Sequence, residues 1–114
     1  DESAMKLFQK IISAYIEYAK QENFIPIFTL LPQKDDLLSM KKSENFVKEF
    51  SNELKNISDL YYIDVIEKLL DNKYLDDIYS DSNDYGGHFS KEGNEVIAKI
   101  IKQFLEEEKI INKV

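Results

Sequence analysis

The stretch "FIPIFTLLP", Phe24 to Pro32, constrains the fold of this chain more than any other. Its apolar run is unbroken and ends at a proline, a pattern typical of a strand that is covered on both faces, as in a parallel sheet. Pro26 fits such a strand only near its start, because proline cannot donate a hydrogen bond to a neighbouring strand. We therefore predict a buried parallel strand in this stretch.

Amphipathic helices are predicted on both sides of this strand. Apolar residues at three-and-four spacing predict a first helix from about Ala4 to Gln21. A second helix should follow Ser43, its candidate N-cap, and "LYYIDV", Leu60 to Val65, should form a second strand. Ser90 is a candidate N-cap for a last helix. The predicted buried stripe of that helix is Val96, Ile97, Ile100, Ile101, Phe104 and Leu105.

This alternation of helices and strands predicts a layered α/β fold over residues 1–114, read as a single domain. Two strands are too few for a complete sheet, since helices on both faces would leave sheet edges and apolar surface uncovered. We therefore expect this chain to form part of a larger sheet. The missing strands would come from another segment of a longer protein or from another chain.

Composition excludes several classes of function. A formal net charge of -7 and a pI near 4.7 disfavour nucleic acid and anionic membranes as partners. The absence of cysteine removes thiolate nucleophiles and cysteine metal sites, and it leaves the cellular compartment open. No apolar run approaches the ~20 residues that cross a bilayer. No cofactor is expected.

The segment "SDSNDYGGHFSKEGNEVIAKI" holds the only histidine, His88, close to several acids. An imidazole with a pKa near ~6.5 can accept and donate a proton around neutral pH, and a carboxylate must fix its tautomer. His88 is therefore a candidate general base. The alternative is a surface histidine among solvated acids that form turns.

Three stretches together, "FIPIFTLLP", "YYIDV" and "DYGGHFSKEGNEVIAKII", resemble the C-terminal half of SGNH (GDSL-type) hydrolases. The resemblance covers nearly the whole chain. It implies part of a flavodoxin-like α/β/α sandwich with a central parallel sheet. It also implies hydrolysis of an ester or O-acetyl group of a small molecule, carbohydrate or lipid, and it is compatible with an extracytoplasmic location.

Carried over to this sequence, the resemblance makes His88 the general base, oriented by an aspartate. The family places that aspartate three residues before the histidine, where Tyr85 stands here. Asp84, four residues before, is the first choice, because the two glycines that precede His88 can adopt backbone angles that absorb an extra residue. Asp81 is the reserve candidate.

The family's nucleophile lies in a Gly-Asp-Ser motif after its first strand, and this sequence contains no such tripeptide. The blocks that carry the oxyanion-hole Gly and Asn also find no match. None of the serines is expected in a sharp turn after a strand; Ser13 and Ser51 fall within predicted helices. The chain is therefore predicted to be the C-terminal portion of a hydrolase and inactive alone, since oxyanion donors usually contribute most of the rate enhancement.

A calcium loop is the strongest alternative, and a non-enzymatic interaction domain is the third. Four residues match positions one, three, six and twelve of an EF-hand loop: Asp81, Asn83, Gly86 and Glu92. Tyr85 and His88 occupy positions where such loops place an oxygen ligand and an apolar residue, so a metal site is not favoured. Asp64, at a strand end, is expected to cap the following helix.

Overall fold

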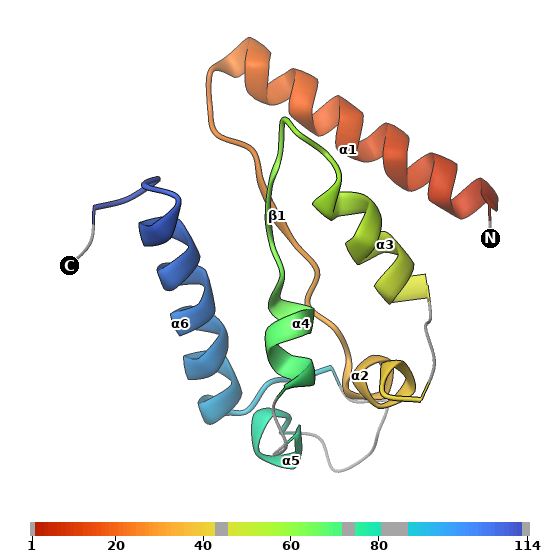
Figure 1. The fold of residues 1–114 in the computed structure, drawn as a ribbon, viewed down its shortest axis with the longest axis vertical. Helices are drawn as coiled ribbons and strands as arrows, with labels where there is room; N and C mark the ends of the chain where they lie inside the picture. The colour runs from red at the N-terminus through yellow and green to blue at the C-terminus, as the bar shows by residue number, and fades with distance from the viewer. Residues whose placement is uncertain (1, 43–45, 72–74, 81–86, 113–114) are drawn as a thin grey trace.

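The computed structural model describes residues 2–42, 46–71, 75–80 and 87–112. Its elements alternate between helices and short strands along the chain (Figure 1). In order, they are α1 (Glu2–Glu22), β1 (Ile27–Thr29), α2 (Lys34–Met40), α3 (Phe46–Lys55), β2 (Tyr61–Ile63), α4 (Val65–Leu70), α5 (Leu75–Ile78) and α6 (Lys91–Glu107).

The two strands pair in parallel, as predicted, with Phe28 opposite Tyr62 in the register. Tyr61 N donates to Pro26 O at 3.1 Å, which extends the ladder toward the start of β1. At the other end, Thr29 Oγ1 donates to Ile63 O at 2.7 Å. Mixed α/β architecture with a parallel sheet is therefore confirmed, and a flavodoxin-like arrangement stays a prediction.

Helices cover both faces of this small sheet (Figure 1). One face packs on α1 and α3 through a buried cluster of Ile12, Ile16, Leu54 and Leu60. The opposite face is covered by α6. In Figure 1, α4 lies beside α6 at the end of β2, and α5 lies below α4. That larger core contains Leu37, Ile63, Val65, Ile66, Leu69, Leu75, Ile78, Tyr79 and Ile97.

The stretch "QKDDLLSMKKSEN" reads from its polar composition as a loop with a short apolar insert, but its first part forms α2. Gln33 and Asp36 make a capping box at its start, in which the Gln33 N–H donates to Asp36 Oδ2 at 3.0 Å. Leu37 is fully buried against the core, and this burial fixes the helix. Lys34 is also buried, and its Nζ lies 2.6 Å from Asp76 Oδ1 of the segment that forms α5.

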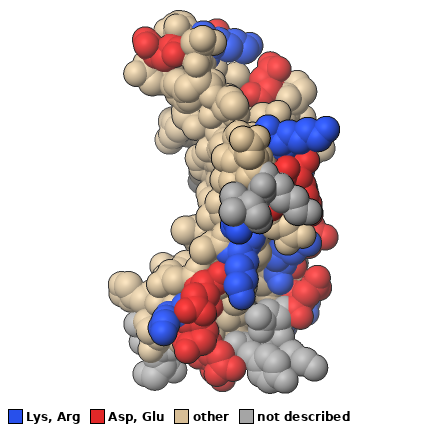
Figure 2. Space-filling model, turned by 90° about the vertical axis from the view of Figure 1, so that its left-hand side faces the viewer, with Lys and Arg blue, Asp and Glu red and all other residues tan. Residues whose placement is uncertain are grey.

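The molecule is a thin slab of 43 × 42 × 19 Å. Figure 1 looks down the shortest axis, and the two strands overlap in that view. The slab is therefore thinnest along the direction that leads from one strand to the other. Figure 2 shows the narrow outline from the side, with lysines and acids interspersed. None of the described helices is long and apolar enough to cross a membrane.

The slab is less compact than a complete domain of this size. Its radius of gyration is 15.3 Å, against about 13 Å for a compact chain of this length. Its accessible surface is 7798 Å², against about 6,500 Å² for a folded monomer of 13.4 kDa. The chain therefore exposes roughly 1,300 Å² more surface than a compact monomer of the same mass.

Candidate functional site

Three chain segments meet beyond the carboxyl ends of the strands, where open α/β sheets place their ligands (Figure 1). β1 continues through Pro32 into α2, and β2 continues through Asp64 into α4. The third segment runs from residue 87 to the start of α6. Tyr79, which follows α5, connects to the segment after β1, because its hydroxyl donates to Pro32 O at 2.7 Å.

His88 lies in this third segment, and its main chain is fixed. Tyr79 and Phe89 form an isolated antiparallel bridge, and their rings stack with centroids 5.0 Å apart. The carbonyl of His88 accepts from the Ser80 N–H at 2.8 Å and from Ser80 Oγ at 3.1 Å. The main chain at His88 is therefore held against Ser80, and the side chain of His88 is exposed.

Ser90 caps α6, as predicted. Its Oγ accepts from the Gly93 N–H at 3.0 Å and donates to Ile78 O at 3.0 Å, while its own N–H donates to Ile78 O at 2.7 Å. The cap anchors the start of α6 to the end of α5. This contact fixes the position of the His88 segment from its C-terminal side.

The backbone before His88 passes close to the start of α2, which follows β1 in the chain. A Cβ atom added to Gly87 would lie 3.3 Å from Cγ of Gln33, the residue that precedes α2. His88 thus lies at the carboxyl edge of the sheet. Asp84 and Asp81 fall outside the described residues, so the identity of the orienting acid stays a prediction.

The proposed calcium ligands are described only in part. Glu92 lies exposed in the first turn of α6, whereas Asp81, Asn83 and Gly86 fall outside the described ranges. Within those ranges, no cluster of three or more acids and histidines could hold a metal ion. The calcium loop therefore stays an untested alternative.

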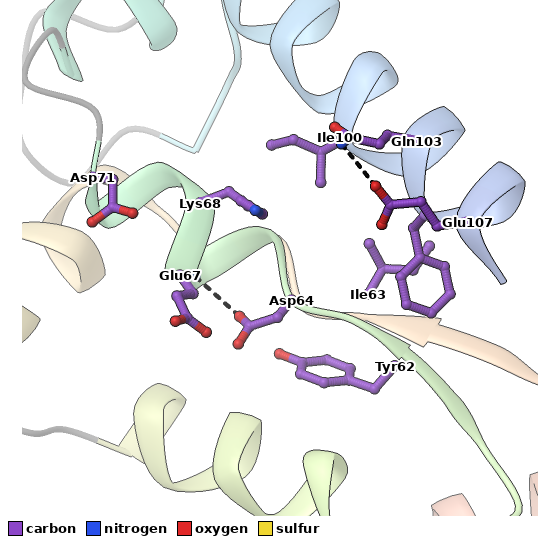
Figure 3. A pocket seen from close by; sticks show the side chains of 10 residues that line it. Tyr62, Ile63, Asp64, Glu67, Lys68, Asp71, Ile100, Gln103 and Glu107 are labelled. Carbon is purple, nitrogen blue, oxygen red and sulfur yellow. Dashed lines mark hydrogen bonds between the residues drawn. The ribbon is translucent and has the colours of Figure 1, made fainter.

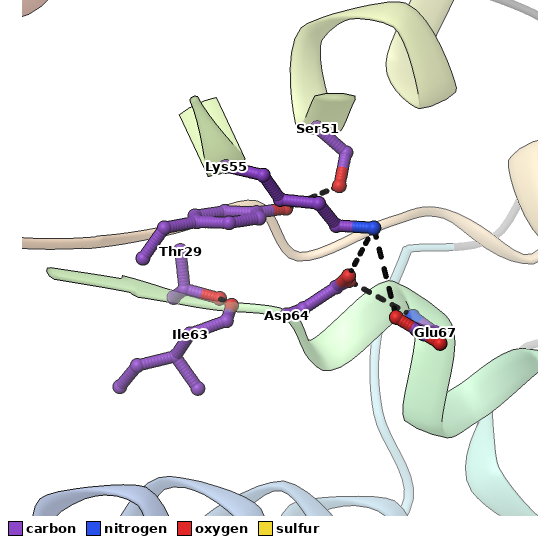
Figure 4. A network of polar contacts seen from close by, with 7 residues as sticks. Thr29, Ser51, Lys55, Ile63, Asp64 and Glu67 are labelled. Carbon is purple, nitrogen blue, oxygen red and sulfur yellow. Dashed lines mark hydrogen bonds and ion pairs between the residues drawn. The ribbon is translucent and has the colours of Figure 1, made fainter. Parts of the chain in front are cut away.

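Asp64 holds the carboxyl end of β2 and caps α4, as predicted (Figure 4). Its Oδ1 accepts from the Glu67 N–H at 3.0 Å, and its Oδ2 lies 2.8 Å from Lys55 Nζ. Lys55 also lies 3.6 Å from Glu67 Oε2. The sequence analysis missed Lys55, because nothing in the spacing of a lysine and an aspartate nine residues apart across a turn indicates that they meet.

Electrostatics favour the charged forms of this pair. Burial raises the pKa of Asp64, but the Lys55 ammonium and the Glu67 N–H outweigh it and hold the pKa below its usual value. The hydrogen bond to Asp64 raises the pKa of Lys55. Next to them, burial raises the pKa of Tyr62, whose hydroxyl lies 2.7 Å from the buried Ser51 Oγ. The pair is therefore charged at neutral pH.

Replacing Asp64 by asparagine should lower the free energy of unfolding by about 1 kcal/mol at pH 7, through loss of a charge-assisted contact. The folded pKa of Asp64 lies below the unfolded value, so its contribution is complete above pH ~4 and is lost as the pH falls through the folded pKa. The difference between Asp64→Asn and wild type should shrink toward zero in acid. Urea unfolding at neutral and acidic pH measures it.

Asp59→Asn is the matched control. Asp59 lies 3.6 Å from Lys20 with both side chains more than half exposed, and such surface pairs contribute little. Its effect should be close to zero at either pH. A constant deficit of Asp64→Asn at all pH values would show that capping geometry, and not charge, gives Asp64 its role.

A cavity of about 380 Å³ opens at the outer side of β2, between α4 and α6 (Figure 3). Its wall carries more acids than bases around an apolar floor. The lining residues are Tyr62, Ile63, Asp64, Glu67, Lys68, Asp71, Ile100, Gln103, Phe104 and Glu107. None of the described residues next to His88 lines it, so the hollow and the histidine are separate features.

Three of the described serines lie where the sequence analysis expected them. Ser13 and Ser51 lie inside α1 and α3, and Ser90 serves as a cap.

Comparisons of the chain with protein-family models, curated proteins and solved structures found no match.

Proposed function

We propose that residues 1–114 form the C-terminal portion of an SGNH-type serine ester hydrolase. The observation that carries the proposal is the position of His88 at the carboxyl edge of two parallel strands, on a segment fixed by Ser80 and Ser90. A general base needs such a rigid support, because a small displacement from the productive geometry costs much of the rate.

In this proposal, His88 takes the proton from a serine hydroxyl as that oxygen attacks the ester carbonyl. It later returns the proton to the leaving alcohol, and water then hydrolyses the acyl intermediate by the same route. Asp84, or Asp81 in reserve, would hold the imidazole in the required tautomer. The serine and the oxyanion donors would come from a segment outside residues 1–114.

The substrate in this proposal is a molecule with an ester or O-acetyl group. The described residues next to His88 in the chain are Gly87, Phe89 and Ser90, and the acyl-binding wall would come from the segment that carries the serine. The esterase, lipase and O-acetylesterase types of the family differ in that wall. In this proposal, residues 1–114 supply the general base for ester hydrolysis, and the segment that carries the serine selects the acyl and alcohol groups.

The 114-residue chain alone should hydrolyse p-nitrophenyl acetate no faster than its His88→Ala variant. The reason is that nucleophile, base and oxyanion donors act as a unit, and the base alone provides little rate enhancement. A longer polypeptide that contains this chain and an upstream Gly-Asp-Ser should turn over the ester. Initial rates of p-nitrophenol release measure both.

Two outcomes would contradict this assignment. Turnover by residues 1–114 that His88→Ala abolishes would place the nucleophile inside this chain. Calcium binding with measurable heat in calorimetry, lost on Glu92→Gln, would support the EF-hand alternative, because a site with several oxygen ligands binds calcium and a His–Asp pair does not.

A further inference from the structure

α1 has a second apolar face, which lies beside the one that packs on the sheet. Ile12 and Ile16 are buried in the core, whereas Leu7, Ile11 and Tyr18 are 60%, 56% and 56% exposed. With the exposed Ala14 they repeat at intervals of four, three and four residues. This is the spacing of a coiled-coil seam, which a second helix covers. We call these four residues the α1 seam.

The apolar surface continues from the α1 seam to the sheet. The rings of Tyr18 and Phe24 lie 5.6 Å apart, and Ile25, just before β1, is 52% exposed. Leu31, just after β1, is 53% exposed. Six of the nine large exposed apolar side chains of the described residues therefore belong to α1 and to the stretches that flank β1, which indicates an interface there.

The outer edge of β1 is partly occupied by the protein itself. Because Tyr61 bonds to Pro26 in the parallel ladder, the N–H and C=O of Ile27 point away from β2. Tyr15 Oη accepts from that N–H and donates to that carbonyl, both at 3.2 Å. A partner that binds at this edge therefore finds the backbone groups of Ile27 already hydrogen-bonded. Its contacts would come mainly from packing against α1.

The charges of α1 suit a second copy of the same helix. Its acids are Glu2, Glu17 and Glu22 and its bases are Lys6, Lys10 and Lys20, so its net charge is zero, while the whole chain carries -7. In an antiparallel pair of identical α1 helices around a two-fold axis, Lys10 of one copy comes next to Glu17 of the other, twice.

We propose that residues 1–114 form a two-fold dimer in which the α1 seams pack against each other in antiparallel orientation. The whole chain exposes roughly 1,300 Å² more surface than a compact monomer of its mass, and a standard interface buries ≈ 800 Å² per partner, so a dimer would remove part of this surplus. The dimer covers the seam and Phe24 and leaves the His88 segment accessible. It does not depend on the ester chemistry proposed above.

Size-exclusion chromatography with light scattering tests the dimer. The 114-residue chain should show twice the 13.4 kDa mass of one chain over a wide concentration range. Ile11→Lys places two charges at the centre of the seam and should give the monomer mass with unchanged circular dichroism, because Ile11 is exposed within one chain. Ile111→Lys, at an exposed apolar position outside α1, is the control and should remain dimeric.

A charge swap tests the antiparallel orientation. Lys10→Glu creates two Glu–Glu contacts and should weaken association about tenfold, equivalent to ~1.4 kcal/mol. Adding Glu17→Lys should restore the wild-type dissociation constant. A wild-type monomer at every concentration, or a dimer that Ile11→Lys leaves intact, would overturn the proposal; failure of the swap to restore association would refute the antiparallel orientation.

Discussion

Replacing Gly93 by alanine should destabilise the domain by about 3 kcal/mol, the upper part of the usual range for overpacking. A Cβ atom at this position would lie 2.1 Å from Ile78 O and 3.0 Å from Ile78 C. These are backbone atoms, so no side-chain rotation can relieve the clash, and α6 must move away from α5. The opposite sign is expected for a free helix, in which alanine is favoured over glycine by up to ~1 kcal/mol.

Gly87→Ala is the matched control for this prediction. Its Cβ would meet only Cγ of Gln33, at 3.3 Å, in a flexible side chain that can shift. We expect a change within ~0.5 kcal/mol. Urea unfolding followed by circular dichroism measures both variants. A Gly93→Ala protein as stable as wild type would show that α5 and α6 do not approach as closely as in this structure.

The close approach at Gly93 also links stability to the candidate site. Ile78 O is the acceptor for both the N–H and the Oγ of Ser90, so the clash falls on the same carbonyl that anchors the cap. Displacing α6 therefore weakens the support of the His88 segment. Gly93→Ala should accordingly impair any function of His88 more than its loss of global stability accounts for.

Local sequence patterns predicted much of the fold, because they depend on neighbouring residues. The three-and-four spacing of α1 placed its ends within two residues, and Ser90 and Asp64 were identified as caps from their positions before apolar runs. The helix α2 was missed, although its acidic first turn favours a helix start, because it is only seven residues long and its burial depends on distant contacts. Leu37 packs on Ile66 and Leu69, which follow it by about thirty residues in the chain and come close only in the fold.

The site was less predictable than the fold, because long-range packing determines it. The motif around His88 indicated a functional loop, yet Gln33 and Ser80, which position that loop, carry no recognisable pattern. The Lys55–Asp64 pair likewise depends on α3 lying beside the end of β2. The cavity at the outer side of β2 requires the placement of α6 relative to α4, and sequence periodicity does not specify it.

Exposed apolar surface, in contrast, was predictable by counting strands. Each strand pairs over only three residues, and a two-stranded sheet with helices on both faces cannot cover all their apolar surface. The exposed Leu7 and Ile11 of α1 are the physical consequence. The dimer proposed above would cover them by pairing the two α1 seams.

His88→Ala should lower kcat by several orders of magnitude in a hydrolase that contains this chain together with its nucleophile segment. Without the imidazole, nothing removes the proton from the serine hydroxyl, and loss of one member of such a unit removes most of its contribution. The fold should be unaffected, because the His88 side chain is exposed. Ester turnover under saturation and unfolding curves of both proteins provide the measurement.

Two aspartate variants of the same hydrolase should separate the candidate orienting acids. Asp84→Asn should reduce kcat substantially but less than His88→Ala, since the amide keeps a hydrogen bond while losing the charge that stabilises the imidazolium. Asp81→Asn should be nearly silent. If Asp81→Asn is instead the damaging change, Asp81 orients His88 and the hydrolase assignment survives. If His88→Ala leaves an active hydrolase unimpaired, the assignment of this loop to the SGNH pattern is wrong, because no other described residue at the carboxyl edge of the sheet is a histidine.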